Sequence, residues 1–260
     1  MKKLFLTGAI VILVLVVAGA VVAVLSLDGI VKRSVETFGP QITKVAVNVD
    51  SVHIRLLNGS AEARGFVVGN PEGFKTTQAI SVGLAEFGVN PVSILSDKIV
   101  IRTIHVESPE ITFEGGLGGN NLGKILDNVK AVAKAGGPAS ARTGATPKTD
   151  ARPGKKIEVD DFLITGAKVS GTLVLPNGRE MALKTLSLPE IHLTDLGSGS
   201  GGLTPAELTR AVLEAVDSAT VKAVAASTVN PAKGAKNLIK NLRAPGKSQK
   251  SLGNVLEQQN

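Results

Sequence analysis

The most hydrophobic part of the chain is its beginning. Residues 4–27 hold 24 consecutive uncharged positions, with Lys3 before them and Asp28 after them. As an α-helix, at about 1.5 Å per residue, this run can cross a hydrocarbon core of roughly 30 Å. The alternative is a cleaved signal peptide, for which Ala18-Gly19-Ala20 offers a small-residue cleavage site. Because the apolar run continues past that site and exceeds a typical signal-peptide core, the pattern favours an uncleaved transmembrane anchor over residues 1–27.

The pattern of apolar positions changes after the anchor. Gly29 to Phe38 predicts a short helix, which Gly39-Pro40 is expected to end. Alternation with a period of two, typical of strands, then covers residues 45–49. It resumes at Val52 with a shift of one residue, which indicates a β-bulge near Asp50-Ser51.

The rest of the body is predicted from the same alternation and from turn residues. Asn58-Gly59 indicates a hairpin, because both positions tolerate the positive φ of a tight turn. Two helices are predicted after glycine-rich stretches: residues 122–134, capped by Asn121, and residues 205–226, opened by the capping box Thr204…Glu207. Strands are predicted over residues 62–68, 80–84, 98–106, 110–114, 157–160, 162–165, 168–175, 181–188 and 191–196.

These elements form two halves, residues 28–134 and 156–229, that look like a diverged repeat. Each half contains β-hairpins, a last strand, a glycine-rich turn and a helix. The expected fold class is α+β: an N-terminal transmembrane helix followed by antiparallel β-hairpin sheets in two repeat-like halves, each ending in a helix. The stretches that correspond between the halves are 49–54 with 159–164, 59–63 with 166–170, and 104–106 with 191–193.

Two segments differ from the halves in composition. Residues 135–155 are rich in Gly, Pro, Ala and Thr without periodicity, which is typical of a flexible linker. Residues 230–260 form a basic tail, in which an amphipathic helix is expected to lie on an anionic membrane surface or to dock weakly on its own domain. The basic, membrane-surface residues of this helix are Lys233, Lys236, Lys240 and Arg243.

Composition and charge narrow the function classes. The chain has 260 residues and no Cys, which excludes disulfides, thiolate metal sites and Cys nucleophiles. It has no Tyr or Trp, the side chains on which single-stranded nucleic acid normally stacks. The net charge of +7 lies mostly in the tail and the linker, whereas DNA-binding folds carry charge on the folded body. No nucleic-acid partner is expected.

No motif points to an enzyme. Residues 197–202 (GSGSGG) have the spacing of a dinucleotide-binding loop, but no second strand with an acidic residue follows, so a flexible turn is the better interpretation. The three histidines occupy alternating strand positions without ligand partners at metal-binding spacing, and they are expected to face solvent: His53, His105 and His192. A wet sheet face is also expected for Glu107, Glu110 and Glu114. No catalytic residue, metal or cofactor is predicted.

The apolar sheet face has two interpretations. If the two predicted helices cover it fully, it is an ordinary core. If they cover only one end, an apolar groove remains, and a groove of that size normally marks a binding site. The residues predicted to face lipid in such a groove are Val45, Val47, Ile54, Val82, Leu84, Ile99 and Ile101.

Several stretches between residues 32 and 129 resemble those of the AsmA-like proteins, and residues 157–215 continue in a similar style. The stretches that carry the resemblance are 49–52 (VDSV), 56–59 (LLNG), 65–74 (GFVVGNPEGF), 93–101 (SILSDKIVI), 109–114 (PEITFE) and 120–129 (NNLGKILDNV). The resemblance implies an inner-membrane anchor, a β-rich body in the periplasm and a relation to bridge-like lipid transfer proteins, whose curved sheets hold acyl chains. It supplies no catalytic residues.

The expected function follows from the anchor and the resemblance. The chain is expected to be a single-pass inner-membrane protein whose C-terminal body lies in the periplasm and takes part in envelope lipid handling or outer-membrane assembly. The body is far shorter than a bridge across the periplasm would need. The alternative is a non-catalytic structural or interaction protein that docks on an envelope partner. Expected partners are membrane lipids, with an envelope protein or a second copy of the chain as further possibilities.

Overall fold

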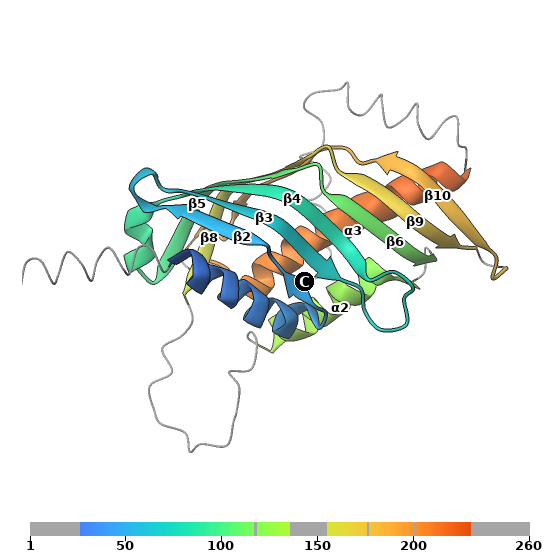
Figure 1. Cartoon of the computed structure of the whole chain (residues 1–260), viewed down its shortest axis with the longest axis horizontal. Coiled ribbons are helices and arrows are strands. Elements are labelled where there is room, and N and C mark those ends of the chain that lie inside the picture. Colours follow the sequence, from blue (N-terminus) through green and yellow to red (C-terminus); the bar gives the residue numbers. More distant parts are fainter. Residues whose placement is uncertain (1–26, 117–118, 136–154, 176, 200, 230–260) are drawn as a thin grey trace, which may run out of the picture.

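The computed structural model describes residues 27–116, 119–135, 155–175, 177–199 and 201–229, and the fold is α+β. One large, curled, mixed sheet packs with three α-helices (Figure 1). Among these residues no helix is both long and apolar enough to cross a membrane. The predicted anchor, all but the two ends of the predicted linker, and the tail lie outside the described residues.

The strands lie close to the predicted ranges and α2 and α3 lie where helices were expected, whereas the two 3₁₀ helices were not predicted. After a helix over residues 27–43, the elements in chain order are β1 (Val47–Asn48), β2 (Ser51–Arg55), η1 (Leu56–Asn58), β3 (Ser60–Gly69), β4 (Gln78–Val89), η2 (Pro91–Leu95), β5 (Lys98–Glu107), β6 (Glu110–Gly116), β7 (Gly119–Asn120), α2 (Asn121–Lys134), β8 (Lys156–Thr165), β9 (Lys168–Val174), β10 (Glu180–Ser187), β11 (Ile191–Leu196) and α3 (Pro205–Val229).

Pairs of consecutive strands join end to end into longer bent strands. β5 and β6 both pair with β4 in one continuous register, Leu84 with Glu107 and Ile80 with Ile111. β8 continues into β9 in the same way, and β10 into β11. The spatial order is therefore β1/β2, β3, β4, β5/β6, β8/β9, β10/β11.

The prediction of purely antiparallel hairpins was wrong at one junction, because β8 runs parallel to β5 and β9 runs parallel to β6. Two adjacent parallel strands need a crossover of a dozen or more residues, and α2 together with the residues before β8 supplies that length. The two predicted halves therefore share one sheet, although the last strand of each precedes a helix.

A straight row of residues crosses all six long strands where each one bends; we call it the crease. It consists of Asp50, Gly65, Gly83, Ser108, Gly166 and Pro189, which the pairing registers place opposite one another in that order. Gly65, Ser108 and Gly166 have left-handed φ angles of 62°, 48° and 66°. On β5/β6, Ile104 is buried before the crease, and Ile111, Phe113 and Glu114 are buried after it.

The crease explains the phase shift near Asp50-Ser51. The strand does break there, as predicted, between β1 and β2. The predicted bulge was wrong, because Asn48 pairs with Val67 and Ser51 with Arg64 in one unchanged register. The shift in burial comes from backbone rotation at the crease rather than from an inserted residue.

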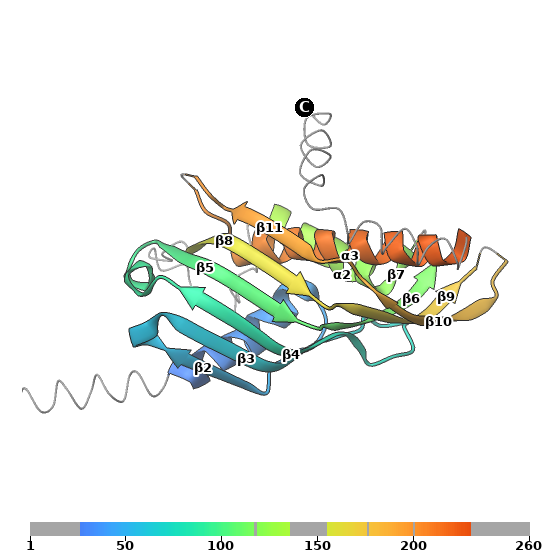
Figure 2. The same cartoon turned by 90° about the horizontal axis from the view of Figure 1, so that it is seen from above.

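Side chains from α2, α3 and the inner sheet face form one hydrophobic core. Figure 2 shows the sheet curling over the two helices. On one side of the crease, two neighbouring cross-strand rows of the inner face are entirely apolar. These rows are Val52, Ala63, Ala85, Val106, Ile164, Ile191 and Ile54, Ala61, Phe87, Ile104, Phe162, Leu193.

The helix over residues 27–43 covers the free edge of β1 and β2. Asp28 Oδ1 accepts a hydrogen bond from Ile54 N at 2.9 Å, and Glu36 Oε1 accepts one from Val49 N at 3.5 Å. Lys32 Nζ donates to the Val49 and Asp50 carbonyls. These bonds occupy edge groups that would otherwise be available to another strand.

Gly39-Pro40 does not end this helix, which was predicted to stop there. Pro40 removes one helical N–H, but the helix is held by its packing against the sheet edge. A Cβ at Gly39 would lie 2.8 Å from Val47 Cβ, so glycine permits this close approach. Packing of the helix on the sheet therefore outweighs the local break signal.

Two helix caps give different outcomes. The capping box of α3 is confirmed, since Thr204 Oγ1 accepts from Glu207 N at 3.2 Å while Glu207 Oε2 accepts from Thr204 N at 2.7 Å. The expected Asn121 cap was wrong by one residue. Asn120 caps α2, because its side chain accepts a hydrogen bond from Gly123 N. Asn121 is fully buried, and its side chain forms hydrogen bonds with residues outside the helix.

Candidate functional site

One cross-strand row on the exposed outer face of the sheet is rich in histidine and glutamate. Its members lie directly opposite one another across β2, β3, β4, β5, β8 and β11: His53, Glu62, Glu86, His105, Leu163 and His192. The row contains all three histidines of the chain. Their solvent-facing position is confirmed, with 53%, 35% and 49% of the side chains exposed in chain order.

Two members of this row, Glu86 and His105, together with Glu107 two residues further along β5, could hold a metal ion. Ligand atoms of Glu86, His105 and Glu107 all lie within 4.8 Å of one another. His105 Nε2 lies 3.1 Å from Thr165 Oγ1, and its Nδ1 lies 3.8 Å from Glu107 Oε1. Nδ1 of His105 therefore faces the carboxylates, and the contact between Nε2 and Thr165 fixes the orientation of the imidazole ring. Residues that hydrogen-bond to metal ligands commonly have this role.

A shallow depression of about 300 Å³ adjoins the row. Arg55, Glu62, Glu86, Thr103 and His105 are among the residues that line it. These walls are charged and open to solvent, so they suit a small ionic ligand rather than an acyl chain. Periodicity alone could not find this site, because it depends on which strands pair and in which register.

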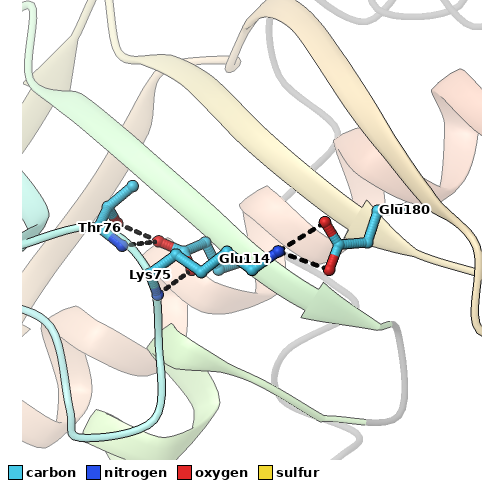
Figure 3. Close-up of polar contacts among 4 residues, drawn as sticks. All are labelled: Lys75, Thr76, Glu114 and Glu180. Carbon is cyan, nitrogen blue, oxygen red and sulfur yellow. Dashed lines mark hydrogen bonds and ion pairs between the residues drawn. The ribbon is translucent and has the colours of Figure 1, made fainter.

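A buried carboxylate, Glu114, fastens the loop after β3 to β6 (Figure 3). Glu114 is 6% exposed and accepts hydrogen bonds from Lys75 N and Thr76 N, each at 2.7 Å, and from Thr76 Oγ1. Burial favours the neutral carboxyl, but the bonds from Thr76 and Lys75 outweigh it and lower the pKa of Glu114. Its role is structural. Glu107 and Glu110 are exposed as expected, whereas the expected solvent exposure of Glu114 was wrong.

The same loop is tied to β10 at the surface. Lys75 Nζ lies 2.7 Å from both carboxylate oxygens of Glu180. Below it, Asn121 Nδ2 donates to Asn70 Oδ1 at 2.8 Å and to the Thr112 carbonyl at 2.7 Å. These contacts connect β3, β6, α2 and β10, so the end of the sheet farthest from η1 is held by polar bonds.

A cleft between α2 and α3 contains the carboxylate of Asp217, one oxygen of which is buried. Asp217 Oδ1 is buried without a hydrogen-bond partner in the part of the chain that the structure describes. Burial raises the pKa of Asp217, and the nearby Asp127 adds to this effect against the attraction of Lys130. Phe74, Leu126 and Val221 give the cleft apolar walls beside these charges.

The residues predicted to face lipid do not share one environment. Val45, Val47 and Val82 are buried. Ile54, Ile99 and Ile101 are half-buried, and they lie near the end of the sheet formed by η1 and η2. Leu84 lies on the outer face, because the strand registers place it between Arg64 and Glu107 and next to Gly83.

The predicted membrane-surface residues lie outside the described part of the chain. They are Lys233, Lys236, Lys240 and Arg243. Comparisons with known proteins add no relative: no family model matches the chain, and neither a curated protein nor a solved structure matches it.

Proposed function

We propose that this chain is a non-catalytic, single-pass inner-membrane protein of AsmA-like type, with its body in the periplasm, that takes part in envelope lipid handling or outer-membrane assembly. The sequence stretches that resemble AsmA-like proteins and the uncharged run over residues 4–27 support this proposal. Membrane lipids are its proposed ligands.

The observation that carries the proposal is the fastening of the helix that follows this run. The described part of this helix covers residues 27–43, from the last residue of the run onward, and Asp28, Lys32 and Glu36 bond it to the backbone of the sheet edge. A membrane anchor attached to such a helix holds the body in a fixed place relative to the bilayer. A flexible tether would not need these contacts.

The half-buried apolar residues indicate where lipid would make contact. The middle of the inner face is filled by side chains of α2 and α3, so the described residues leave no continuous apolar trough. Ile54, Ile99 and Ile101 remain half-buried near the end where the anchor helix begins. An acyl chain entering from the bilayer would reach these residues first.

The test is lipid extraction from the purified full-length protein. Wild type extracted in a mild detergent is expected to retain phospholipid detectable by mass spectrometry, and to stay in the membrane pellet after a carbonate wash with Met1 intact. Ile101→Asp should lose the lipid, whereas the matched outer-face change Leu84→Asp should keep it, with thermal midpoints measured for both. Wild type without lipid would overturn the lipid role, and release by carbonate would overturn the anchor.

A second candidate function, docking on an envelope protein, is favoured by the opposite sheet edge. β10 and β11 end the strand order, and most β10 side chains are exposed. An unpaired edge can accept a strand from another chain. A photo-crosslinker at Lys184 would capture such a partner, and the same probe at Gln78, on an interior strand, is the control.

A further inference from the structure

Exposed apolar side chains are concentrated at one end of the sheet. Among the described residues, eight large hydrophobic side chains are exposed, and three of the most exposed lie on the 3₁₀ turns: Leu57 at 101%, Val92 at 79% and Leu95 at 90%. Two more, Ile30 and Val31, lie in the first turns of the 27–43 helix. Single exposed apolar residues are common, but a group at one tip marks a contact surface.

The two turns are packed side by side and form one tip. Val89 N donates to the Gly59 carbonyl at 2.6 Å, which joins the residue after η1 to the residue before Asn90 and η2. A Cβ at Gly59, where φ is 61°, would lie 3.1 Å from Pro91 Cδ. Leu57, Val92 and Leu95 therefore belong to one surface, which we call the apolar tip.

The apolar tip lies beside the start of the 27–43 helix. Asp28 accepts its hydrogen bond from Ile54, three residues before Leu57. Figure 1 shows the β2–β3 turn at the opposite end of the sheet from β9 and β10. The chain thus leaves the described body, toward its 24-residue uncharged run, at the same end as the apolar tip.

Basic side chains surround the apolar tip. Arg55 is the last residue of β2, Arg102 Nη2 donates to the Val89 carbonyl at 3.2 Å, and Lys155 Nζ donates to the Ile94 carbonyl. All three side chains are exposed. Apolar residues that project beyond a basic collar fit a bilayer with anionic headgroups, because the apolar part enters the acyl region while the cations meet the phosphates.

We propose that Leu57, Val92 and Leu95 form a membrane-docking tip that inserts into the anionic bilayer from which the chain emerges. This proposal rests on the proposed anchor. The tip and the anchor form two attachments of the body to one bilayer, and each would strengthen the other through a high effective concentration. Docking would also bring half-buried Ile54, Ile99 and Ile101 against the lipid.

The absence of cysteine makes a direct test possible. Single-cysteine variants Leu57→Cys, Val92→Cys and Leu95→Cys of the full-length chain are labelled with a polarity-sensitive fluorophore and reconstituted into phosphatidylethanolamine–phosphatidylglycerol vesicles. Val174→Cys and Met181→Cys are matched controls, because they are exposed apolar sites, at 36% and 40%, on β9 and β10. Thermal midpoints should match wild type, since none of these sites is buried.

Tip labels are expected to shift to the blue, to be quenched several-fold more by spin-labelled lipid than the controls, and to resist aqueous iodide. Tip labels that iodide quenches as well as it quenches the controls would overturn the docking proposal while leaving the anchor intact. Labels shielded from both quenchers would show that a second copy covers the tip, which also overturns it. Failure of wild type to float with the vesicles would overturn the anchor itself, and the docking proposal with it.

Discussion

Gly65 lies so close to Asp50 that a side chain in its place would force Asp50 to move. A Cβ built on Gly65 would stand 2.0 Å from Asp50 Oδ2, and the Gly65 φ angle is 62°. The two residues face each other at the first pair of strands crossed by the crease, where Asp50 N donates to the Arg64 carbonyl at 3.0 Å. The bend of the whole sheet therefore depends on glycine at this position.

Gly65→Ala is expected to destabilise the protein by about 3 kcal/mol, because it adds a steric clash to left-handed backbone strain. The control is Gly73→Ala, which has a positive φ of 94° but no atom within 4 Å of the new Cβ. The control should cost only about 1 kcal/mol. Urea unfolding of both variants checks the difference, and equal costs would mean that Asp50 moves aside freely.

Glu114 is expected to make the protein sensitive to acid. Its pKa is lowered in the folded state, so its contribution to stability is complete above its unfolded value, about 4.3, and is lost as the pH falls through the folded value. Glu114→Gln should flatten the loss of stability between about pH 5 and pH 3 and should lower stability at pH 7. Thermal midpoints across this range test it, with the exposed Glu110→Gln as control. Parallel curves for wild type and Glu114→Gln would contradict it.

Asp217 is expected to have the opposite effect on the pH dependence of stability, because it destabilises the folded protein at neutral pH rather than at acidic pH. Burial raises its pKa, so the charged form costs stability at neutral pH, and this cost disappears as the pH falls through the folded value. Asp217→Asn should therefore stabilise the protein at pH 7 and leave little difference at pH 4. Glu214→Gln, on the same helix, should instead lose the 3.2 Å pair with Lys130. Destabilisation by Asp217→Asn at pH 7 would refute this account.

Glu86 is expected to lower the stability of the folded protein. It lies directly opposite Glu62, and like charges across a strand pair repel. Glu62 has Arg64 at 3.5 Å, whereas no ion pair joins Glu86 among the described residues. Glu86→Gln should stabilise the protein by about 0.5 kcal/mol. Glu62→Gln, which loses the contact with Arg64, should not stabilise it. A loss of stability in Glu86→Gln would instead point to a bound cation.

The local signals of the sequence were reliable where one residue type has one strong preference. The capping box at Thr204 and Glu207 is confirmed. A hairpin does form at Asn58-Gly59, but η1 joins its strands and of the two residues only Gly59 has a positive φ. Strands form where alternation was predicted on β3, β4 and β5, although Leu84 does not follow it. Each depends on neighbours a few residues apart, so the sequence contains the whole interaction. The stop expected at Gly39-Pro40 failed because a distant residue, Val47, packs against the helix.

The candidate sites could not be found in this way. His53, His105 and His192 are far apart in the chain and were expected to be unrelated, yet five successive strand registers bring them into one row. Leu84 was assigned to the apolar face by its alternation with Val82. The strand registers place it on the outer face instead, between Arg64 and Glu107 and next to Gly83.

The sequence by itself determined the α+β class, the strands, the helices α2 and α3, and the apolar run that precedes the described body. Periodicity and turn chemistry act within a few residues, and they are written in the order of the chain. Only the tertiary structure decided that β8 lies parallel to β5, that the crease is shared by six strands, and that the turns carrying Leu57 and Leu95 lie together at the end of the sheet beside Asp28. Those relationships depend on pairing between segments that are distant in the chain. This pairing is selected because both paired segments are buried against the same helices.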